Sequence, residues 1–150
     1  MTWGSSIPAA VAALTAAWTA ALPGVDVRNG PAVADDSAME AVVVGYQDAE
    51  TPAFEWEFEP DGFTSTPMRQ PYTINCLLTV RDGDGDAIAA QLRAFALIGL
   101  MGGALAADSS LGGLVLYAHL GAGAMTQTQT NIGATARVPF DVAVDAYTTT

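Results

Sequence analysis

Lysine is absent from this 150-residue sequence, and its only basic side chains are Arg28, Arg69, Arg81, Arg93 and Arg137. Sixteen aspartates and glutamates oppose these five arginines, which gives a formal net charge of -11 at pH 7. Proteins that bind nucleic acid tightly draw much of their affinity from basic side chains on the phosphates. The charge balance therefore disfavours tight DNA or RNA binding, although a surface that repels DNA remains useful wherever DNA must pass without sticking.

Cysteine and histidine each occur once. Cys76 cannot form an internal disulfide, and its place in an alternating apolar strand predicts a small buried hydrophobic residue rather than a nucleophile. His119 lies in the apolar run "LVLYAHLGAG" without a second histidine or a cysteine to share a metal, so we interpret it as a core or strand-end residue. No Ser/His/Asp or Cys/His arrangement is supported. We expect no enzymatic activity, no metal and no cofactor.

Neither of the two long apolar runs is typical of an export signal or a membrane span. The run that starts at Ile7 has no basic residue before it, because the first one is Arg28, so it lacks the charged start of a signal peptide. The second, from Ala94 to Ala107, has 14 residues, too few for a hydrocarbon core of roughly 30 Å. We expect both to be helices packed on a sheet, in a soluble intracellular protein without a membrane partner.

The stretch "DGDGD", residues 82–86, is the part of the chain that most resembles a binding site. A calcium loop starting at Asp82 requires glycine at its sixth position and glutamate at its twelfth, but Ala87 and Arg93 stand there. A helix start accounts for the same residues, since glycines make the turn and Asp84 or Asp86 caps the helix. We predict a helix cap and no calcium site.

Two helices are predicted, in a chain whose 51% hydrophobic content suits a single domain over residues 1–150. The first runs from Ile7 to Leu22, with a cap at Ser5 or Ser6, and the second runs from the "DGDGD" cap to about Ala107. The second contains Gly99, Gly102 and Gly103, each of which costs about 1 kcal/mol of helix propensity. Such a helix is typically approached closely by another backbone, either its own sheet or a neighbouring subunit.

Strands are predicted between the helices, and the clearest period of two is "FEWEFEP", residues 54–60. It places Glu55, Glu57 and Glu59 on one face and three aromatic residues on the other, which we interpret as part of the core. Residues 60–71 are predicted to form a hairpin tip, and the strand of residues 72–83 is predicted to return alongside residues 54–60.

Three further strands are predicted after the second helix. The segments are residues 114–120, the polar "MTQTQTN" of residues 125–131, and residues 135–148, where Pro139 suggests a sheet edge or a bulge. The polar segment has no hydrophobic face, so it either projects as a ribbon or pairs with another protein. The complete order of elements predicts an α+β fold: a mixed, mainly antiparallel sheet with two helices packed on one face.

Seven segments in this order resemble the tail terminator proteins of long-tailed, siphovirus-type phages that infect actinobacteria. They are "IPAAVAALTAAW", "VRNGP", "AVVVGY", "YTINCLLTVRDGDGD", the long second helix, "DSSLGG" and "GATARVPFDVAVDAY". The resemblance covers nearly the whole chain, and its motifs are capping and turn signals whose order and spacing carry it.

The resemblance implies a structural virion protein that forms a hexameric ring on the head-proximal end of the tail tube, ends tube growth and presents a surface to the neck. Its partners would be further copies of the chain, the tail tube protein and a neck or head completion protein, with genomic DNA passing through without specific binding. Candidate lumen-facing residues are Glu55, Glu57 and Glu59. Candidate subunit or tube contacts are Met125, Gln127, Gln129 and Asn131.

Two alternatives stay open at this point. Another neck component, such as a head completion or head-to-tail joining protein, would have similar size and symmetry. A small α+β ligand-binding domain or enzyme would instead use the aromatic face of residues 54–58 to line a pocket, with His119 or Cys76 taking part.

Overall fold

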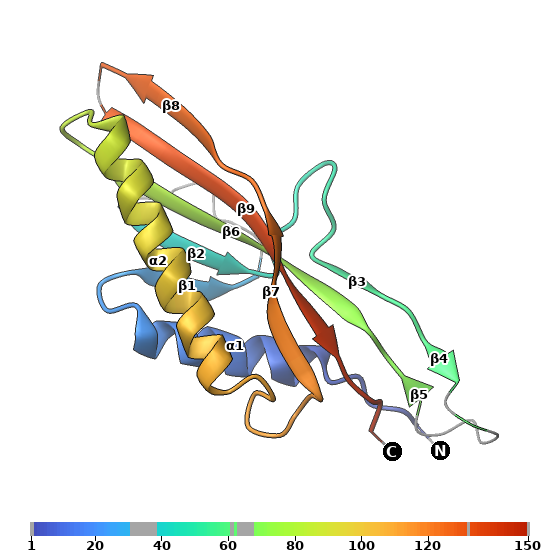
Figure 1. The fold of residues 1–150 in the computed structure, drawn as a ribbon. Helices are drawn as coiled ribbons and strands as arrows, with labels where there is room; N and C mark the ends of the chain where they lie inside the picture. Colours follow the sequence, from blue (N-terminus) through green and yellow to red (C-terminus); the bar gives the residue numbers. More distant parts are fainter. Residues whose placement is uncertain (1, 31–38, 61, 63–67, 132, 150) are drawn as a thin grey trace.

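The computed structural model describes residues 2–30, 39–60, 62, 68–131 and 133–149. Within them, helices α1 (Ile7–Ala21) and α2 (Ala87–Ala107) lie on one side of a seven-stranded sheet (Figure 1). The sheet strands are β1 (Asp26–Asn29), β2 (Glu40–Val44), β3 (Phe54–Trp56), β6 (Tyr72–Asp82), β7 (Tyr117–Gly123), β8 (Thr126–Thr130) and β9 (Gly133–Asp145). A separate two-stranded sheet holds β4 (Glu59–Pro60) and β5 (Met68–Arg69).

Two long strands, β6 and β9, form the axis of the main sheet. They pair antiparallel from Tyr72 opposite Val144 to Asp82 opposite Ala134. On the other side of β6 lie β2 and β3, and on the other side of β9 lie β7 and β8. Among the described strands, only β1 runs parallel to its neighbour, β2. The predicted α+β fold with a mixed, mainly antiparallel sheet is therefore confirmed.

The core lies between the helices and one face of the sheet, as predicted. The inward side chains of β6 are all buried, at alternate positions: Tyr72, Ile74, Cys76, Leu78 and Val80. A hydrogen bond from Trp18 Nε1 to the carbonyl oxygen of Met101, at 3.2 Å, joins α1 to α2 inside this core. Burial of Trp18 thus leaves no indole N–H without a partner, which buried tryptophan requires.

The two helix starts differ in how they are capped. At α2 the prediction is confirmed, because the Asp86 carboxylate accepts a hydrogen bond from the backbone N–H of Ala89 at 3.0 Å. At α1, Ser6 occupies the cap position but its hydroxyl bonds the Tyr72 hydroxyl at 2.9 Å. The neighbouring Ser5 hydroxyl accepts from the Ile7 N–H at 3.2 Å instead. Tertiary contact at Ser6 has therefore replaced a local cap.

The predicted aromatic core strand at residues 54–60 is wrong in part. Pairing with β6 is confirmed at Phe54 opposite Ile74, but β3 ends at Trp56. Phe54 packs against the core, whereas Trp56 is 53% exposed and Phe58 is 45% exposed. The physical reason is that neither helix extends over this end of the sheet, where β3, β4 and β5 reach away from α1 and α2 (Figure 1). The hairpin is confirmed by the pairing of Glu59 with Arg69, while residues 61 and 63–67 of its predicted tip lie outside the described residues.

The end of the chain also differs from the predictions. The segment 114–120 is a strand only from Tyr117, because residues 108–116 form turns and a bend after α2. Strand β9 is internal, so an edge position for Pro139 is wrong. The predicted irregularity lies in the partner, since the β7 register shifts between Leu120 and Gly123 and the chain then continues into β8.

The face of the sheet away from the helices carries a small buried apolar cluster of Val43, Tyr46 and Leu77. The connection from β2 to β3 returns to the same edge of β6 here, since Asn75 donates from its backbone N–H to the Ala53 carbonyl and from Nδ2 to the Pro52 carbonyl, at 3.0 and 2.7 Å. The Tyr46 hydroxyl accepts a hydrogen bond from Arg137 at 2.6 Å on the same face. This face is therefore partly covered rather than uniformly wet.

Helix α2 is longer than its 14-residue apolar run, with 21 residues and a single charged side chain, Arg93. By length and composition it is the one helix among the described residues that would be able to cross a membrane. One side of α2 is nevertheless packed on β6, β9 and α1 through Ala90, Ala94, Leu97, Met101 and Leu105. The opposite side is apolar as well, and the fold does not bury it.

Candidate assembly surfaces

The three predicted lumen residues lie on the extension formed by β3, β4 and β5, and all three are exposed. Glu55 pairs with Thr73 in the main sheet, Glu57 lies between strands, and Glu59 pairs with Arg69 in the small sheet. The regular alternation of the sequence is thus divided over two sheets. The glutamates share one projecting segment rather than one continuous strand face.

An ion pair anchors this extension to the end of β9. Arg69 donates to both carboxylate oxygens of Asp145, from Nε at 2.8 Å and from a terminal nitrogen at 2.5 Å. The hydrogen bonds lower the pKa of Asp145 and raise that of Arg69, with the charge of Glu59 adding to the latter. Bidentate geometry of this kind fixes direction as well as distance. The acidic segment therefore has a defined attachment.

Three exposed aromatic residues lie on this extension or against it, and we call them the aromatic arm: Trp56 and Phe58 of the extension, and Trp3 of the N-terminal segment. The rings of Trp3 and Phe58 lie 5.8 Å apart at an interplanar angle of 57°, a tilted contact that joins the N-terminal segment to the extension. Trp3 is 46% exposed. Large aromatic side chains left this open on a small protein indicate a contact surface.

The predicted contact residues of the polar segment have different roles. Gln127 and Gln129 of β8 donate from Nε2 to the carbonyl oxygens of Ala87 and Gly85, both at 2.7 Å. Met125 packs against the core, and Asn131 is exposed in the turn after β8. Strand β8 pairs with β9 in its own chain, so the ribbon alternative is confirmed (Figure 1). Pairing with another protein through its outer edge stays a prediction.

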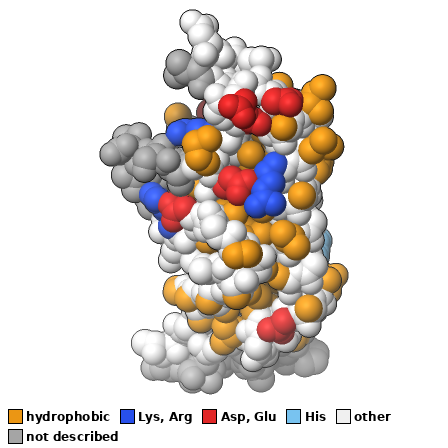
Figure 2. Space-filling view, turned by 90° about the vertical axis from the view of Figure 1, so that its left-hand side faces the viewer, with side chains coloured by type: hydrophobic (Ala, Val, Ile, Leu, Met, Phe, Trp, Pro, Cys, Tyr) orange, Lys and Arg blue, Asp and Glu red, His pale blue; other side chains and the backbone are white. Residues whose placement is uncertain are grey.

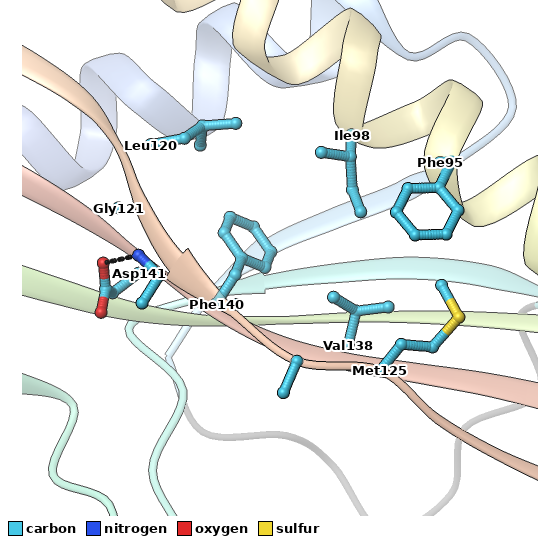
Figure 3. Close-up of a pocket in the computed structure, with 11 residues that line it drawn as sticks. Phe95, Ile98, Leu120, Gly121, Met125, Val138, Phe140 and Asp141 are labelled. Atoms are coloured by element: carbon cyan, nitrogen blue, oxygen red, sulfur yellow. Dashed lines mark hydrogen bonds between the residues drawn. The ribbon is translucent and has the colours of Figure 1, made fainter.

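A hollow of about 240 Å³ opens between α2 and the bend that joins β7 to β8 (Figure 3). We call it the α2 groove. Phe95 and Ile98 enter it from α2, Val138 and Phe140 from β9, Leu120 from β7, and Met125 from the link between β7 and β8 (Figure 3). These side chains point toward one another, and all six are apolar.

The rim of the α2 groove is formed by the glycine- and alanine-rich bend at residues 121–124. Asp141 is its one acidic lining residue, and the Asp141 carboxylate accepts a hydrogen bond from the Ala122 N–H at 3.0 Å. A side chain at Gly121 would collide with that carboxylate, which explains glycine at this position. The Asp141 carboxylate is thus hydrogen-bonded to the backbone at the rim, and the six side chains named above make the interior of the groove apolar.

The exposed side of α2 continues from the groove along the helix. We define the outer face of α2 by Ile88, Leu92, Phe95, Gly99 and Gly103, which recur at helical spacing. The three large side chains are 67%, 65% and 58% exposed, and Leu100 beside them is 47% exposed. Seen from the left-hand side of Figure 1, hydrophobic side chains are spread over much of the height of the protein, with acidic and basic side chains among them, mainly in the upper half (Figure 2).

The glycines of α2 differ in what lies next to them within the chain. A side chain at Gly102 would approach Leu120 of β7 at 3.3 Å, so Gly102 serves docking on the chain's own sheet. At Gly99 and Gly103 no atom lies within 4 Å of the added carbon among the described residues. Packing within the chain accounts for one glycine, and it does not account for the two on the outer face.

The residues considered for chemistry are not assembled into a site. Cys76 is buried as predicted, and burial raises the pKa of its thiol to about 12. The core or strand-end position predicted for His119 is wrong, because its side chain is exposed within β7, where alternate side chains point away from the core. No group of three or more His, Cys, Asp or Glu side chains within the described part of the chain is placed to hold a metal ion.

No known protein family and no curated protein matches the chain. The exposed side of α2 is the main feature that the sequence reading missed. A signal was present, because a helix that is apolar all round must bury more than one side. Ile88, Leu92 and Phe95 lie on the side opposite Ala90, Ala94 and Leu97, so a single sheet cannot cover both sets.

Proposed function

We propose that the chain is a structural subunit of a phage tail, which forms a ring at the head-proximal end of the tube, ends tube growth and offers a surface to the neck. One observation carries the assembly role. Among the described residues of this strongly charged small protein, large apolar side chains stay uncovered, and they include the aromatic arm and the outer face of α2. Contiguous apolar surface of this kind marks protein contact in soluble proteins.

The specific place in the tail rests on the resemblance together with charge. A net charge of -11 and exposed Glu55, Glu57 and Glu59 suit a ring through which DNA moves without adhering. In this proposal the three glutamates face the lumen of the ring. The partners are further copies of this chain, the tail tube protein and a neck protein. The protein is then part of the virion, assembled in the host cytoplasm.

Electron microscopy of lysates made with the gene disrupted tests the proposal. Overlong tails without heads are expected, because tube growth has lost its stop. Filled heads beside tails of normal length would instead favour another neck component, such as a head completion or joining protein. Normal infectious particles would contradict both assembly roles.

Lysine replacements test the lumen assignment separately. A triple variant with Glu55→Lys, Glu57→Lys and Glu59→Lys is expected to assemble tails of normal length but to eject DNA slowly. Each copy then loses three negative charges and gains three positive ones, which attract phosphates. The matched control replaces Asp84, Glu50 and Asp108 with lysine, which changes net charge equally at exposed sites away from the extension. Unchanged infectivity and ejection in the triple variant would remove these glutamates from the lumen.

A second candidate function is the binding of a small apolar ligand in the α2 groove. The observation that favours it is the apolar hollow itself, which exceeds the cavity of about 150 Å³ that accepts benzene in an engineered protein. Thermal stabilisation of the chain by small aromatic compounds, abolished by Phe95→Ala, would support ligand binding. Absence of stabilisation across such compounds would leave the groove to a protein partner.

A further inference from the structure

We propose that the aromatic arm of one copy inserts into the α2 groove of the next copy, so that the ring is built from head-to-tail contacts. The inference rests on the proposed ring and adds which two surfaces form it. Three arm residues, Trp3, Trp56 and Phe58, and the groove around Phe95 are the partners. The occupant is a second copy of this chain.

The position of the two surfaces supports a contact between copies rather than within one. The arm projects from the end of the sheet that carries both termini, while the groove lies beside α2 on the body of the protein (Figure 1). A contact between two different patches of identical chains is heterologous, and it closes into a ring when the rotation between copies allows it. Contact of one α2 face with another α2 face would stop at a dimer.

The shapes of the two surfaces match in size and chemistry. The groove holds about 240 Å³, room for one aromatic ring, and six apolar side chains line it. Trp56 is 53% exposed, and no aromatic ring of the described residues stacks on it, whereas Trp3 and Phe58 contact each other. Exposed tryptophan that fills an apolar pocket on a partner is a recurrent source of binding energy. Trp56 is therefore the central residue of the proposed contact.

Charge favours the same pairing. The arm is flanked by Glu55 and Glu57, so a partner surface rich in carboxylates would repel it. Helix α2 carries no acidic residue along its 21 residues, and its single charge, Arg93, is positive. Arg93 binds Glu40 through two hydrogen bonds, at 2.5 and 3.1 Å, which leaves the middle of α2 close to neutral. Among the described residues that line the groove, Asp141 alone is acidic, and its carboxylate accepts a hydrogen bond from the Ala122 N–H, so an acidic arm meets one carboxylate there rather than several.

The outer-face glycines fit an incoming arm. Gly99 lies one turn after Phe95, and Gly103 one turn further, with open space above both. Among the described residues, no atom of the chain itself would obstruct a partner that approaches the helix backbone at these two positions. Each glycine lowers helix propensity, and no contact within the chain requires glycine at these two positions. Close packing against a neighbouring copy would explain both.

Sedimentation velocity from about 1 µM to about 1 mM tests self-association, because weak subunit contacts have dissociation constants in this range. The wild-type chain is expected to associate with rising concentration. An arm variant, Trp56→Ala with Phe58→Ala, and a groove variant, Phe95→Glu, are each expected to weaken association about tenfold or more. Phe95→Ala serves as a milder groove variant, and circular dichroism checks that every variant is folded.

Matched controls lie on exposed apolar residues outside both surfaces. Met39→Ala controls for the arm variant, and Leu116→Glu controls for the added charge of the groove variant, since Met39 is 50% and Leu116 is 54% exposed. Both controls are expected to associate like the wild type. Equal loss of association in the controls would contradict the assignment of these two surfaces.

Mixing the variants decides the geometry. The arm variant keeps an intact groove and the groove variant keeps an intact arm, so a mixture is expected to form dimers of one of each and nothing larger. A mixture that stays monomeric while the wild type associates would overturn head-to-tail contact. A wild-type chain that stays monomeric over the whole concentration range would overturn the inference. The proposed role in ending tube growth would still be tested separately, by tail length in phage with the gene disrupted.

Discussion

Gln129 on strand β8 donates a hydrogen bond from Nε2 to the carbonyl oxygen of Gly85, at 2.7 Å, in the turn that starts α2. The two residues are 44 positions apart in the sequence. Gln127 makes the same type of bond to Ala87. Together they attach the polar hairpin to the N-terminal end of the helix, and they satisfy carbonyl groups beside the cap.

Gln129→Ala is expected to lower the free energy of unfolding by about 0.5–1.5 kcal/mol, the usual net value of one hydrogen bond. Urea denaturation measures this change. Thr128→Ala is the control, because it also shortens an exposed β8 side chain and loses β propensity but leaves both glutamine contacts intact. Equal destabilisation by the two variants would show that the Gln129 bond contributes nothing beyond strand propensity.

Glycine replacements are expected to act in opposite directions at two sites. Gly99→Ala should raise the free energy of unfolding of the monomer by about 1 kcal/mol, since it adds helix propensity where no atom lies within 4 Å. Gly133→Ala should lower it, because Gly133 has φ +151° and an added carbon would lie 2.8 Å from the Asp82 carbonyl oxygen. Thermal unfolding of dilute protein measures both. A destabilised Gly99→Ala monomer would contradict an open outer face.

Asp86→Ala is expected to destabilise the protein by about 1 kcal/mol through loss of the α2 cap. Asp86→Asn should retain most of that stability, because asparagine also caps helices well. Asp84→Ala is the control, because Asp84 lies in the same turn, two residues before the cap. Calcium should not change the unfolding temperature of the wild type. A calcium-dependent rise that Asp86→Ala abolishes would restore the calcium-loop interpretation of residues 82–86.

The pH dependence of stability is expected to include a contribution from Asp145. Hydrogen bonds from Arg69 lower the folded-state pKa of Asp145 below its ordinary value of 3.8. A group with a lowered folded pKa stabilises the protein above its unfolded pKa, and that stability is lost as pH falls through the folded pKa. Chemical unfolding at several pH values below about 5 should therefore show a shallower acid loss for Asp145→Asn.

Protonation of many carboxylates also relieves repulsion in a chain this acidic, so the comparison needs a charge-matched variant. Asp84→Asn removes the same charge at an exposed position that forms no salt bridge with the described arginines. Its acid limb is expected to follow that of the wild type. Identical acid limbs for Asp145→Asn and Asp84→Asn would mean that the Arg69 pair gives no specific stability.

Local signals predicted much of the fold. The boundaries of α1 and α2 follow from Pro8, the Asp86 cap and hydrophobic periodicity, which act within a few residues. Alternation predicted the buried side of β6 because one strand face must be buried against the helices. Pairing of β3 with β6 followed from the predicted hairpin, whose two strands are neighbours in the sequence, whereas the register of Phe54 opposite Ile74 comes from the structure.

Predictions that depended on distant contacts succeeded less often. Alternation at residues 54–60 indicated a strand, but burial of Trp56 and Phe58 required a covering layer that α1 and α2 do not provide there. The polar face of β8 was visible in the sequence, whereas its contacts with Gly85 and Ala87 depend on how the hairpin lies against α2. The α2 groove combines residues 95–98 with residues 120–140, so no local pattern describes it.

The sequence by itself determined the α+β class, the helix ends, the inward residues of β6 and the strongly acidic surface. These properties depend on composition, period and capping, all of which act over a few neighbouring residues. Tertiary structure alone decided which apolar residues remain uncovered. Two helices are enough to cover the middle of the sheet, and their placement leaves one side of α2 and the aromatic arm in contact with solvent.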